Sequence, residues 1–380
     1  MKPDYEGGSI VNLMSSIAHR FKAKTGYPQL KKLPGRELKA KNIILLVLDG
    51  IGHHYLKRFP DSFLAQHMKG SMTSVFPSTT ASCVTTFATG VAPQQHAITA
   101  WYMFFKEYGV VAAPLTFVPR FGGIPLDMLG LEMKELIDTP PLADRLKVKS
   151  YAILPKELTT SSYSKLLRGK SQFVRYTGLE NFFRGIKRTV RLHNRRKFIY
   201  AYWPEFDGLS HAFGNSHGMT AAHFLVLDRE VERLVKTLKD TTIIMTADHG
   251  FMDTTPKEII LMKRHPKMAE CLSIPLCGEP RAVYCYVRPD KKDQFERYVK
   301  EKLKEYCTLH TSQSLIKAGY FGKGKLHPKL RDRIGDYVLL MKKNYIMKDA
   351  LAGRKARAHR GNHGGISNEE MMVPLVVIDC

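Results

Sequence analysis

Short apolar runs that end at acidic residues or prolines are the feature that most constrains how this chain can fold. Residues 42–48 are almost entirely apolar, which is typical of a strand buried on both faces of a parallel sheet. Similar runs span residues 198–203 and 242–247, and residues 220–239 between them carry apolar side chains at helical spacing. A strand, a helix and a strand of these lengths predict a right-handed βαβ unit. The sequence therefore predicts an α/β fold, with a mostly parallel central sheet flanked by helices on both faces.

The pattern of strands and helices changes along the chain, which predicts three regions. A helix over residues 10–21 and a basic connector precede the first strand, and a last apolar run lies at residues 373–378. Between these, shorter strand and charged-helix patterns begin after residue 254, with strands expected at 282–287 and 336–341 and a helix at 291–306. We predict an N-terminal helix and basic connector (1–41), an α/β core (42–254 plus 346–380) and an inserted smaller α/β lobe (255–345).

The net charge of the chain favours anionic partners. Lys and Arg number 59 against 35 Asp and Glu, which gives a formal charge of +24. Nucleic acid, an anionic membrane surface and a phosphorylated small molecule all fit this charge, to which basic stretches at residues 184–197 and 354–360 contribute. No obligate protein partner is indicated. Because no apolar run reaches the roughly 20 residues of a bilayer span and the N-terminus shows no signal-peptide pattern, we expect a cytoplasmic protein.

Polar side chains of the metal-ligand type follow the predicted strands or lie in a glycine-rich loop near the C-terminus. In open parallel sheets, ligands bind outside the carboxyl ends of the strands, so these side chains are expected to converge at one edge. The set consists of Asp49, Asp207, His211, Asp248, His249 and His363.

The composition of this set indicates a metal centre. Mixed carboxylate and imidazole ligands suit zinc and, less selectively, manganese or iron. Six ligands are too many for one catalytic zinc, which uses three, but they suit two metals with three ligands each. Two metals can hold both the attacking and the leaving oxygen of a phosphoryl displacement. Taken singly, each residue also fits a turn, a helix cap or a structural histidine; the set together favours the metal centre.

Residues 76–90 offer hydroxyl groups for a nucleophile. Pro77 is followed by Ser78, Thr79 and Thr80 and by a run of small residues that could begin a helix. A hydroxyl at a helix N-terminus lies at the positive end of the helix dipole, where an anion is stabilised. The alternative for each hydroxyl is a helix cap.

Over residues 42–379 these pieces resemble, in order, the type I phosphodiesterase/nucleotide pyrophosphatase family of the alkaline phosphatase superfamily. The matching motifs are Asp49-Gly50, Phe-Pro-Ser-x-Thr80 with Thr-Gly90, Asp207-x-x-x-His211, Asp248-His249-Gly250 and His363-Gly364-Gly365. The resemblance implies that Thr80 is the nucleophile and passes through a phosphothreonine intermediate. It also implies two Zn²⁺ ions, with Mn²⁺ or another divalent metal as the alternative. One ion, which activates the nucleophile, would be held by Thr80 with Asp49, Asp248 and His249. The second, on the leaving-group side, would be held by Asp207, His211 and His363.

Two positions depart from the pattern that the resemblance leads one to expect. The family usually carries a lysine where this chain has Thr79, and an asparagine that binds phosphoryl oxygens where this chain has Trp101. Trp101 and the adjacent Tyr102 are therefore candidate substrate-binding residues, since an aromatic ring can stack on a base. An ordinary core tryptophan is the alternative for Trp101.

The sequence thus predicts a two-zinc phosphoric-ester hydrolase that cleaves a phosphodiester or pyrophosphate bond, with nucleotide-type substrates first by resemblance. A phosphomonoesterase and a phosphotransferase or mutase of the same superfamily are the enzymatic alternatives. A catalytically idle protein that binds nucleic acid or membrane through its basic surface is the alternative from another class; it predicts salt-sensitive anion binding without turnover.

Overall fold

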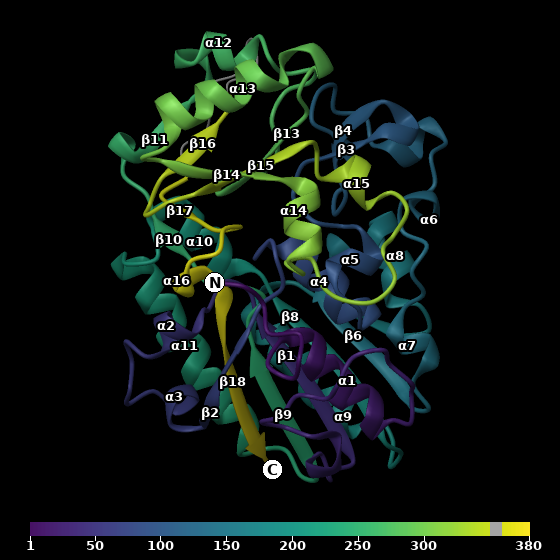
Figure 1. Ribbon diagram of the computed structural model, residues 1–380. Coiled ribbons are helices and arrows are strands. Elements are labelled where there is room, and N and C mark those ends of the chain that lie inside the picture. The colour runs from purple at the N-terminus through teal and green to yellow at the C-terminus, as the bar shows by residue number, and fades with distance from the viewer. Residues whose placement is uncertain (350–358) are drawn as a thin grey trace.

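A mostly parallel central sheet forms the larger part of the molecule. The computed structural model describes residues 1–349 and 359–380. Seven strands lie in the order β2-β18-β9-β1-β8-β6-β7. Only β18 runs against its neighbours, and Figure 1 shows this strand leading to the C-terminus. This arrangement confirms the predicted fold class. The strands are β1 (Asn42–Leu48), β2 (Met68–Thr73), β6 (Lys149–Pro155), β7 (Gln172–Tyr176), β8 (Lys197–Trp203), β9 (Thr241–Thr246) and β18 (Met372–Asp379).

The apolar character of β1 follows from its place at the centre of the sheet. All of its residues are buried, and it pairs in parallel with β8 on one side and β9 on the other. Alternate side chains enter two separate cores because successive residues of a strand point to opposite faces. Ile43 and Leu45 pack in the core that contains α1 (Ile10–Arg20) and α4 (Thr80–Thr89).

Helices α9 (Gly178–Arg191) and α11 (Gly218–Val235) cover the other face. Phe182 and Phe224 from these helices share a core with Ile44 and Leu46 of β1. The predicted strand–helix–strand pattern is present as β8, α11 and β9, but β1 lies between the two strands, so they are not neighbours.

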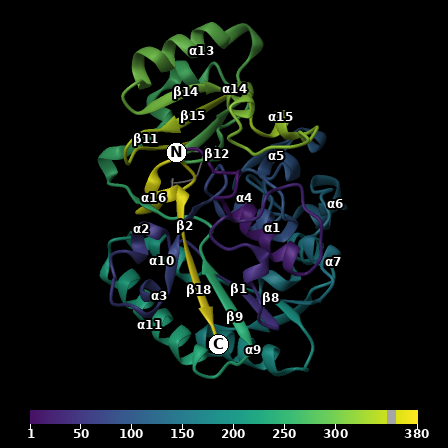
Figure 2. The ribbon, with the colours of Figure 1, turned by 60° about the horizontal axis from the view of Figure 1, so that its bottom comes forward.

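A second, antiparallel sheet lies beyond one edge of the first (Figures 1 and 2). Its order is β12-β13-β15-β14, and its strands are β12 (Cys277–Glu279), β13 (Ala282–Cys285), β14 (Cys307–Thr311) and β15 (Tyr337–Met341). A parallel pair, β11 (Ile259–Leu261) and β16 (Ile346–Lys348), accompanies it. These strands lie largely where the sequence predicts an inserted lobe, although the division of the chain into domains itself stays a prediction.

Helices in this second part are shorter than their sequence patterns indicate. The predicted helix at 291–306 is wrong in its continuity: α13 (Lys292–Tyr298) gives way to a π-helical segment, Val299–Leu303. Phe295, Val299 and Leu303 are all buried on one side, so the wider turn keeps the apolar face against the second sheet. Among the described residues, no helix is both long and apolar enough to cross a bilayer.

Three short strands that follow α4 in the chain have no counterpart in the sequence prediction. They are β3 (Met103–Phe105), β4 (Val110–Ala113) and β5 (Val118–Pro119), which form a small antiparallel sheet. Runs of two to four residues are too short to show a two-residue periodicity above ordinary variation.

Strand direction brings the predicted site residues to one edge. β9, β1 and β8 all end at this edge, and β2 also runs toward it because β18 opposes both β2 and β9. The loop before β18 therefore lies there as well. This edge faces the second sheet (Figure 1).

Candidate active site

Each predicted metal-ligand residue arrives at this edge from a different strand end or loop. Asp49 follows β1, and Asp248 and His249 follow β9. Asp207 and His211 lie one turn apart on α10 (Glu205–Phe213), which begins just after β8. His363 lies in the loop before β18, next to the two-residue strand β17 (Gly361–Asn362).

Gly50 allows the chain to leave β1 beside this group. Its φ of 79° lies in the left-handed region, and a Cβ there would approach the Phe251 ring to 2.5 Å. A side chain at this position would therefore displace Phe251. That ring contacts three of the histidines edge-on, namely His211, His249 and His363.

The imidazoles of these three histidines are oriented alike by the backbone. Nδ1 of His211, His249 and His363 lies 2.9, 3.1 and 3.2 Å from the carbonyl oxygens of Gly361, Gly250 and Ser78, respectively. Donation of the Nδ1 proton to a carbonyl leaves Nε2 as the free acceptor, which is the usual way in which a metal-binding histidine is held. All three Nε2 atoms face the centre of the group.

Among the residues that the structure describes, no hydrogen-bond partner is found for one oxygen of each of the three carboxylates. These buried oxygens are Asp49 Oδ1, Asp207 Oδ1 and Asp248 Oδ2. The other oxygens of two of them are held: Asp49 Oδ2 accepts from the Tyr202 hydroxyl, and Asp248 Oδ1 accepts from the Gly50 and His249 amides. Buried polar atoms normally have partners, so three orphaned acceptors in one place fit cation ligands.

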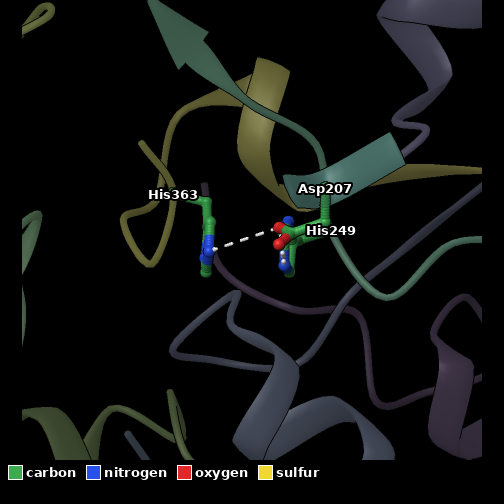
Figure 3. A group of neighbouring side chains, drawn as sticks. All are labelled: Asp207, His249 and His363. Atoms are coloured by element: carbon green, nitrogen blue, oxygen red, sulfur yellow. Dashed lines mark ion pairs between the residues drawn. The ribbon is translucent and has the colours of Figure 1, made fainter. Parts of the chain in front are cut away.

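The ligand-type atoms form two overlapping groups. Oxygen or nitrogen atoms of Asp49, Asp248 and His249 lie within 4.8 Å of one another, as do those of Asp207, His249 and His363. Figure 3 shows the second group, in which Asp207 Oδ1 is 3.9 Å from His249 Nε2 and 3.8 Å from His363 Nε2. The imidazoles of His249 and His363 stack with their centroids 3.7 Å apart.

His211 completes the second side of the site. Its Nε2 is 3.2 Å from His363 Nε2 and 3.5 Å from Asp207 Oδ1. All six predicted ligand residues are thus brought together. His249 lies between the two sides.

Burial, and after it the crowding of like charges, perturbs the pKa values of Asp49 and His363. Burial, followed by the charges of Asp248 and Asp207, raises the pKa of Asp49 well above its ordinary value. Burial and the neighbouring histidines lower the pKa of His363 well below its ordinary value. Both directions favour the uncharged forms, so a bound cation would relieve the carboxylate repulsion and accept the neutral imidazole. The residues present therefore fit a divalent metal centre.

The six Asp and His side chains described above are called the metal-type cluster. Thr80 is the first residue of α4 and lies beside it. Its Oγ1 is 3.3 Å from His249 Nε2. The preceding Thr79 is the N-cap residue but does not cap the helix with its side chain. Within the described part of the chain, no acceptor is found for the backbone N–H groups of Thr80, Ala81 and Ser82. A buried helix N-terminus with free amides favours an anion at this point.

A cavity of about 610 Å³ opens onto Thr80 and the second side of the cluster. Its walls include the two predicted aromatic residues. Trp101 is 38% exposed, so the interpretation of this residue as a core tryptophan is wrong. Tyr102 packs under the Arg120 guanidinium, whose carbon lies 5.0 Å from the ring centroid. The size lies within the range usual for small-molecule sites.

Several residues of the cavity wall were not predicted from the sequence. Glu279 enters from β12 of the second sheet, and Arg120 from the end of β5. His359 lies beside the cluster, with its Nδ1 3.1 Å from His211 Nδ1. No motif surrounds these residues; only the glycine-rich segment around His363 could have drawn attention to His359.

The structure describes the first of the two basic stretches in full but only part of the second. Residues 184–197 lie mainly on α9 and on the turn into β8, near the amino ends of the parallel strands and so away from the cluster. In the second stretch, Arg354, Lys355 and Arg357 lie outside the described residues.

A mostly parallel sheet with paired Asp/His groups at its carboxyl edge is the arrangement of the alkaline phosphatase superfamily. Within it, the family model described as "Type I phosphodiesterase / nucleotide pyrophosphatase" matches residues 43–366, and the chain belongs to this family. It is accordingly a hydrolase of the phosphodiesterase/nucleotide pyrophosphatase kind, and the family implies dependence on divalent metal. Comparison with curated proteins found no match.

Solved structures show the same fold at low sequence identity. Murine ectonucleotide pyrophosphatase/phosphodiesterase 5 is 17% identical, with a TM-score of 0.67 over 89% of this chain and 88% of that chain. An inactive variant of the murine protein in complex with AMP is likewise 17% identical, with a TM-score of 0.67 over 88% and 87%. The human protein of the same name is 15% identical, with a TM-score of 0.66 over 88% and 87%.

Proposed function

We propose that this hydrolase cleaves a phosphodiester or pyrophosphate bond of a nucleotide-type substrate through a phosphothreonine at Thr80. Two divalent cations, zinc by preference, would be held by the six Asp and His side chains. The observation that supports this most strongly is that three orphaned carboxylate oxygens and three histidine Nε2 atoms converge beside the Thr80 hydroxyl. Asp and His ligands match the preference of zinc.

The assignment of ligands follows the two sides of the cluster. Asp49, Asp248 and His249 would hold one cation at the Thr80 hydroxyl, which would itself be a ligand. Asp207, His211 and His363, on the cavity side, would hold the other. When bound, the cations would supply charge stabilisation to the attacking and leaving oxygens.

The protein's own groups carry out the two displacement steps. Thr80 Oγ loses its proton and forms a bond to phosphorus, while the bond from phosphorus to the leaving oxygen breaks and that oxygen takes up a proton. Water then attacks the phosphothreonine, and the bond from phosphorus to Thr80 Oγ breaks to restore the hydroxyl. The free amides at the start of α4 stabilise the phosphoryl charge in both steps.

The cavity supports a nucleotide-type substrate. Trp101 and Tyr102 provide aromatic surface beside Thr80, and Arg120 provides a cation in the same wall. The murine relative was solved with AMP, which is in keeping with this substrate class.

Hydrolysis of chromogenic esters by the zinc-loaded protein tests the proposal. Bis(p-nitrophenyl) phosphate and the p-nitrophenyl ester of thymidine monophosphate should be turned over faster than p-nitrophenyl phosphate. Thr80→Ala should reduce kcat by about 10³-fold or more, as loss of a nucleophile does in other covalent mechanisms. Thr80→Ser, which keeps a hydroxyl, is the matched control, and acid-quenched wild-type protein should contain phosphothreonine at residue 80.

The alternatives give different results in the same experiment. Preference for the monoester would indicate a phosphomonoesterase. Transfer of the phosphoryl group to an added alcohol in place of water would indicate a phosphotransferase. Zinc binding without turnover of any ester, together with salt-sensitive binding of anions, would indicate the idle binding protein.

A further inference from the structure

One carboxyl group joins the two positions at which this chain departs from the pattern expected for its family. The Thr79 hydroxyl donates to Glu279 Oε1 at 2.7 Å, and the Trp101 backbone amide donates to the same oxygen at 2.6 Å. Thr79 immediately precedes the nucleophile, and Trp101 occupies the place where an asparagine that binds phosphoryl oxygens is expected. Glu279 therefore lies at the point where the phosphoryl-binding group is otherwise missing.

The surroundings of Glu279 hold it rigidly in the cavity wall. It is 5% exposed and ends β12, which is docked on the aromatic segment by a hydrogen bond of 2.8 Å from the Gly278 amide to the Tyr102 carbonyl. On its other side, a Cβ added to Gly364 would lie 2.5 Å from the Glu279 Cβ, so the backbone beside His363 packs directly against it. Glu279 is thus packed between the nucleophile helix, Trp101 and the loop that carries His363.

The second carboxyl oxygen is the one available to a substrate. Both hydrogen bonds end on Oε1, and within the described residues no protein group donates to Oε2. Because Glu279 lines the cavity beside Thr80, Oε2 is placed to meet a group bound there.

Charge decides which form of Glu279 can meet a phosphoryl group. An ionised carboxylate would repel the anionic oxygens, whereas a carboxylic acid can donate a hydrogen bond to them. Burial, with a smaller contribution from the charge of Asp207, raises the pKa of Glu279 to about 7 against the opposite effect of the Thr79 and Trp101 hydrogen bonds, so the acid form is accessible near neutrality. Among the described residues, the charged or titratable groups that share the cavity are Asp207, His211, His359 and His363 beside the metal-type cluster, together with Tyr102, Arg120, Cys277, Lys348 and Asp349.

We propose that Glu279, as a carboxylic acid, donates a hydrogen bond from Oε2 to a non-bridging phosphoryl oxygen of the substrate. It thereby supplies the donor that an asparagine amide is expected to supply from the position of Trp101. The inference deepens the proposed function and rests on phosphoryl binding at Thr80.

Glu279→Gln tests the donor because glutamine resembles a permanently protonated Glu279. Its Oε1 can still accept from Thr79 and Trp101, and its Nε2 carries a hydrogen that cannot be lost to base. The kcat/KM of Glu279→Gln relative to wild type should rise about tenfold per pH unit above about pH 7 as the wild type loses its donor. Glu279→Ala should lose about 10²-fold in kcat/KM, the usual cost of removing one oxyanion donor. Glu301→Gln is the same change at an exposed site in the second part of the molecule, and its kcat/KM relative to wild type should not change with pH.

Calorimetry of AMP binding separates this inference from turnover. In zinc-loaded Thr80→Ala protein at pH 8, AMP binding measured in two buffers of different ionisation enthalpy should take up about one proton. The Thr80→Ala/Glu279→Gln protein should take up none. The role of Glu279 would be overturned if the kcat/KM of Glu279→Gln relative to wild type did not change with pH, or if both proteins took up the same number of protons on binding AMP. Loss of all ester hydrolysis with this proton uptake retained would instead count against the proposed function alone.

Discussion

Replacing Asp49 by Asn should have opposite effects on the stability of the metal-free and the zinc-loaded protein. Asp49 and Asp248 place ligand oxygens within 4.8 Å of each other in a buried site. Without a cation these charges repel, which is part of the reason that the pKa of Asp49 is raised. Asparagine has nearly the same shape, keeps an acceptor for the Tyr202 hydroxyl and removes the charge.

The size of the effect follows from the spacing. Two unit charges 4.8 Å apart interact by about 3.5 kcal/mol at an effective dielectric constant of about 20. For 380 residues, an unfolding entropy of about 2.1 cal/mol/K per residue totals about 0.8 kcal/mol/K. With both carboxylates ionised, the metal-free Asp49→Asn protein should therefore melt about 4 °C higher than the wild type, and more if the oxygens lie closer than 4.8 Å. In the zinc-loaded protein, each tenfold loss of affinity should remove about 1.4 kcal/mol of the stability that the ion adds.

The same reasoning fixes the pH dependence of the metal-free protein. Because the native pKa of Asp49 lies above that of the unfolded chain, the native state binds more protons over the interval between them. Stability therefore falls as the pH rises through the native pKa. Asp49→Asn should flatten this fall, so its advantage over the wild type should grow toward alkaline pH.

Thermal unfolding followed by circular dichroism, once with chelator and once with zinc, measures the change in melting temperature of the metal-free and of the zinc-loaded protein. Asp61→Asn is the matched control, since Asp61 is exposed and belongs to neither group of ligand-type atoms. The reasoning would be refuted if Asp49→Asn lowered the melting temperature of the chelated protein, because Asp49 would then be a stabilising carboxylate and not one of a repelling set.

Three further changes test the packing around the site. Arg281→Met should lower the unfolding free energy by about 3–5 kcal/mol in urea titrations, because it leaves Glu370, paired with Arg281 at 2.7 Å, buried without its cation. The pKa of His96 is lowered to about 3, chiefly by burial, so the unfolding free energy of the wild type should fall below about pH 6.5 and be about 2 kcal/mol lower at pH 5. His96→Gln should remove this pH dependence, as measured by urea titrations at about pH 6.5 and pH 5. Phe251→Ala should cost about 3–5 kcal/mol and, by loosening the three histidines, weaken zinc binding about 10–100-fold in competition with a chelator.

Each of these has a result that would contradict it. The double change Arg281→Met/Glu370→Met should recover part of the loss, and full additivity of the single changes would deny the pair. An unchanged slope in His96→Gln would assign the acid sensitivity to other groups. Zinc affinity that is unchanged in Phe251→Ala would show that the backbone carbonyls alone orient the imidazoles.

The metal-type cluster could be predicted because its residues are tied to the strongest sequence signals. Asp49 and Asp248 directly follow apolar runs, and strand direction places both at one edge of the sheet. His363 was harder, since the strand that it follows, β17, has only two residues, and only its glycine-rich surroundings and the family pattern indicated it. What no local pattern could give is the reversal of β18, which brings that loop to the same edge.

Glu279 could not be predicted for the opposite reason. It follows two buried residues of a three-residue strand, and nothing in its neighbours distinguishes it from an ordinary strand end. Its significance arises only from pairing between distant segments, when β12 bridges to Tyr102 and brings the carboxyl to Trp101. Sequence reasoning marked Trp101 as a departure, yet the compensating residue is distant in sequence.

The distribution of residues between the two sheets bears on how substrate choice can change in this protein. Thr80 and all six ligand-type residues belong to the segments that build the edge of the central sheet, whereas one wall of the cavity, from Leu276 to Pro280, belongs to the second sheet and the chain around it. That wall reaches Thr79, the neighbour of Thr80, through the hydrogen bond to Glu279, and it packs against Gly364 beside His363. Substitutions on β12 can therefore alter the hydrogen-bond donors and charge that a phosphoryl group meets while every ligand-type residue stays in place. A change of ester preference in this fold thus requires no change in the strand ends that form the cluster.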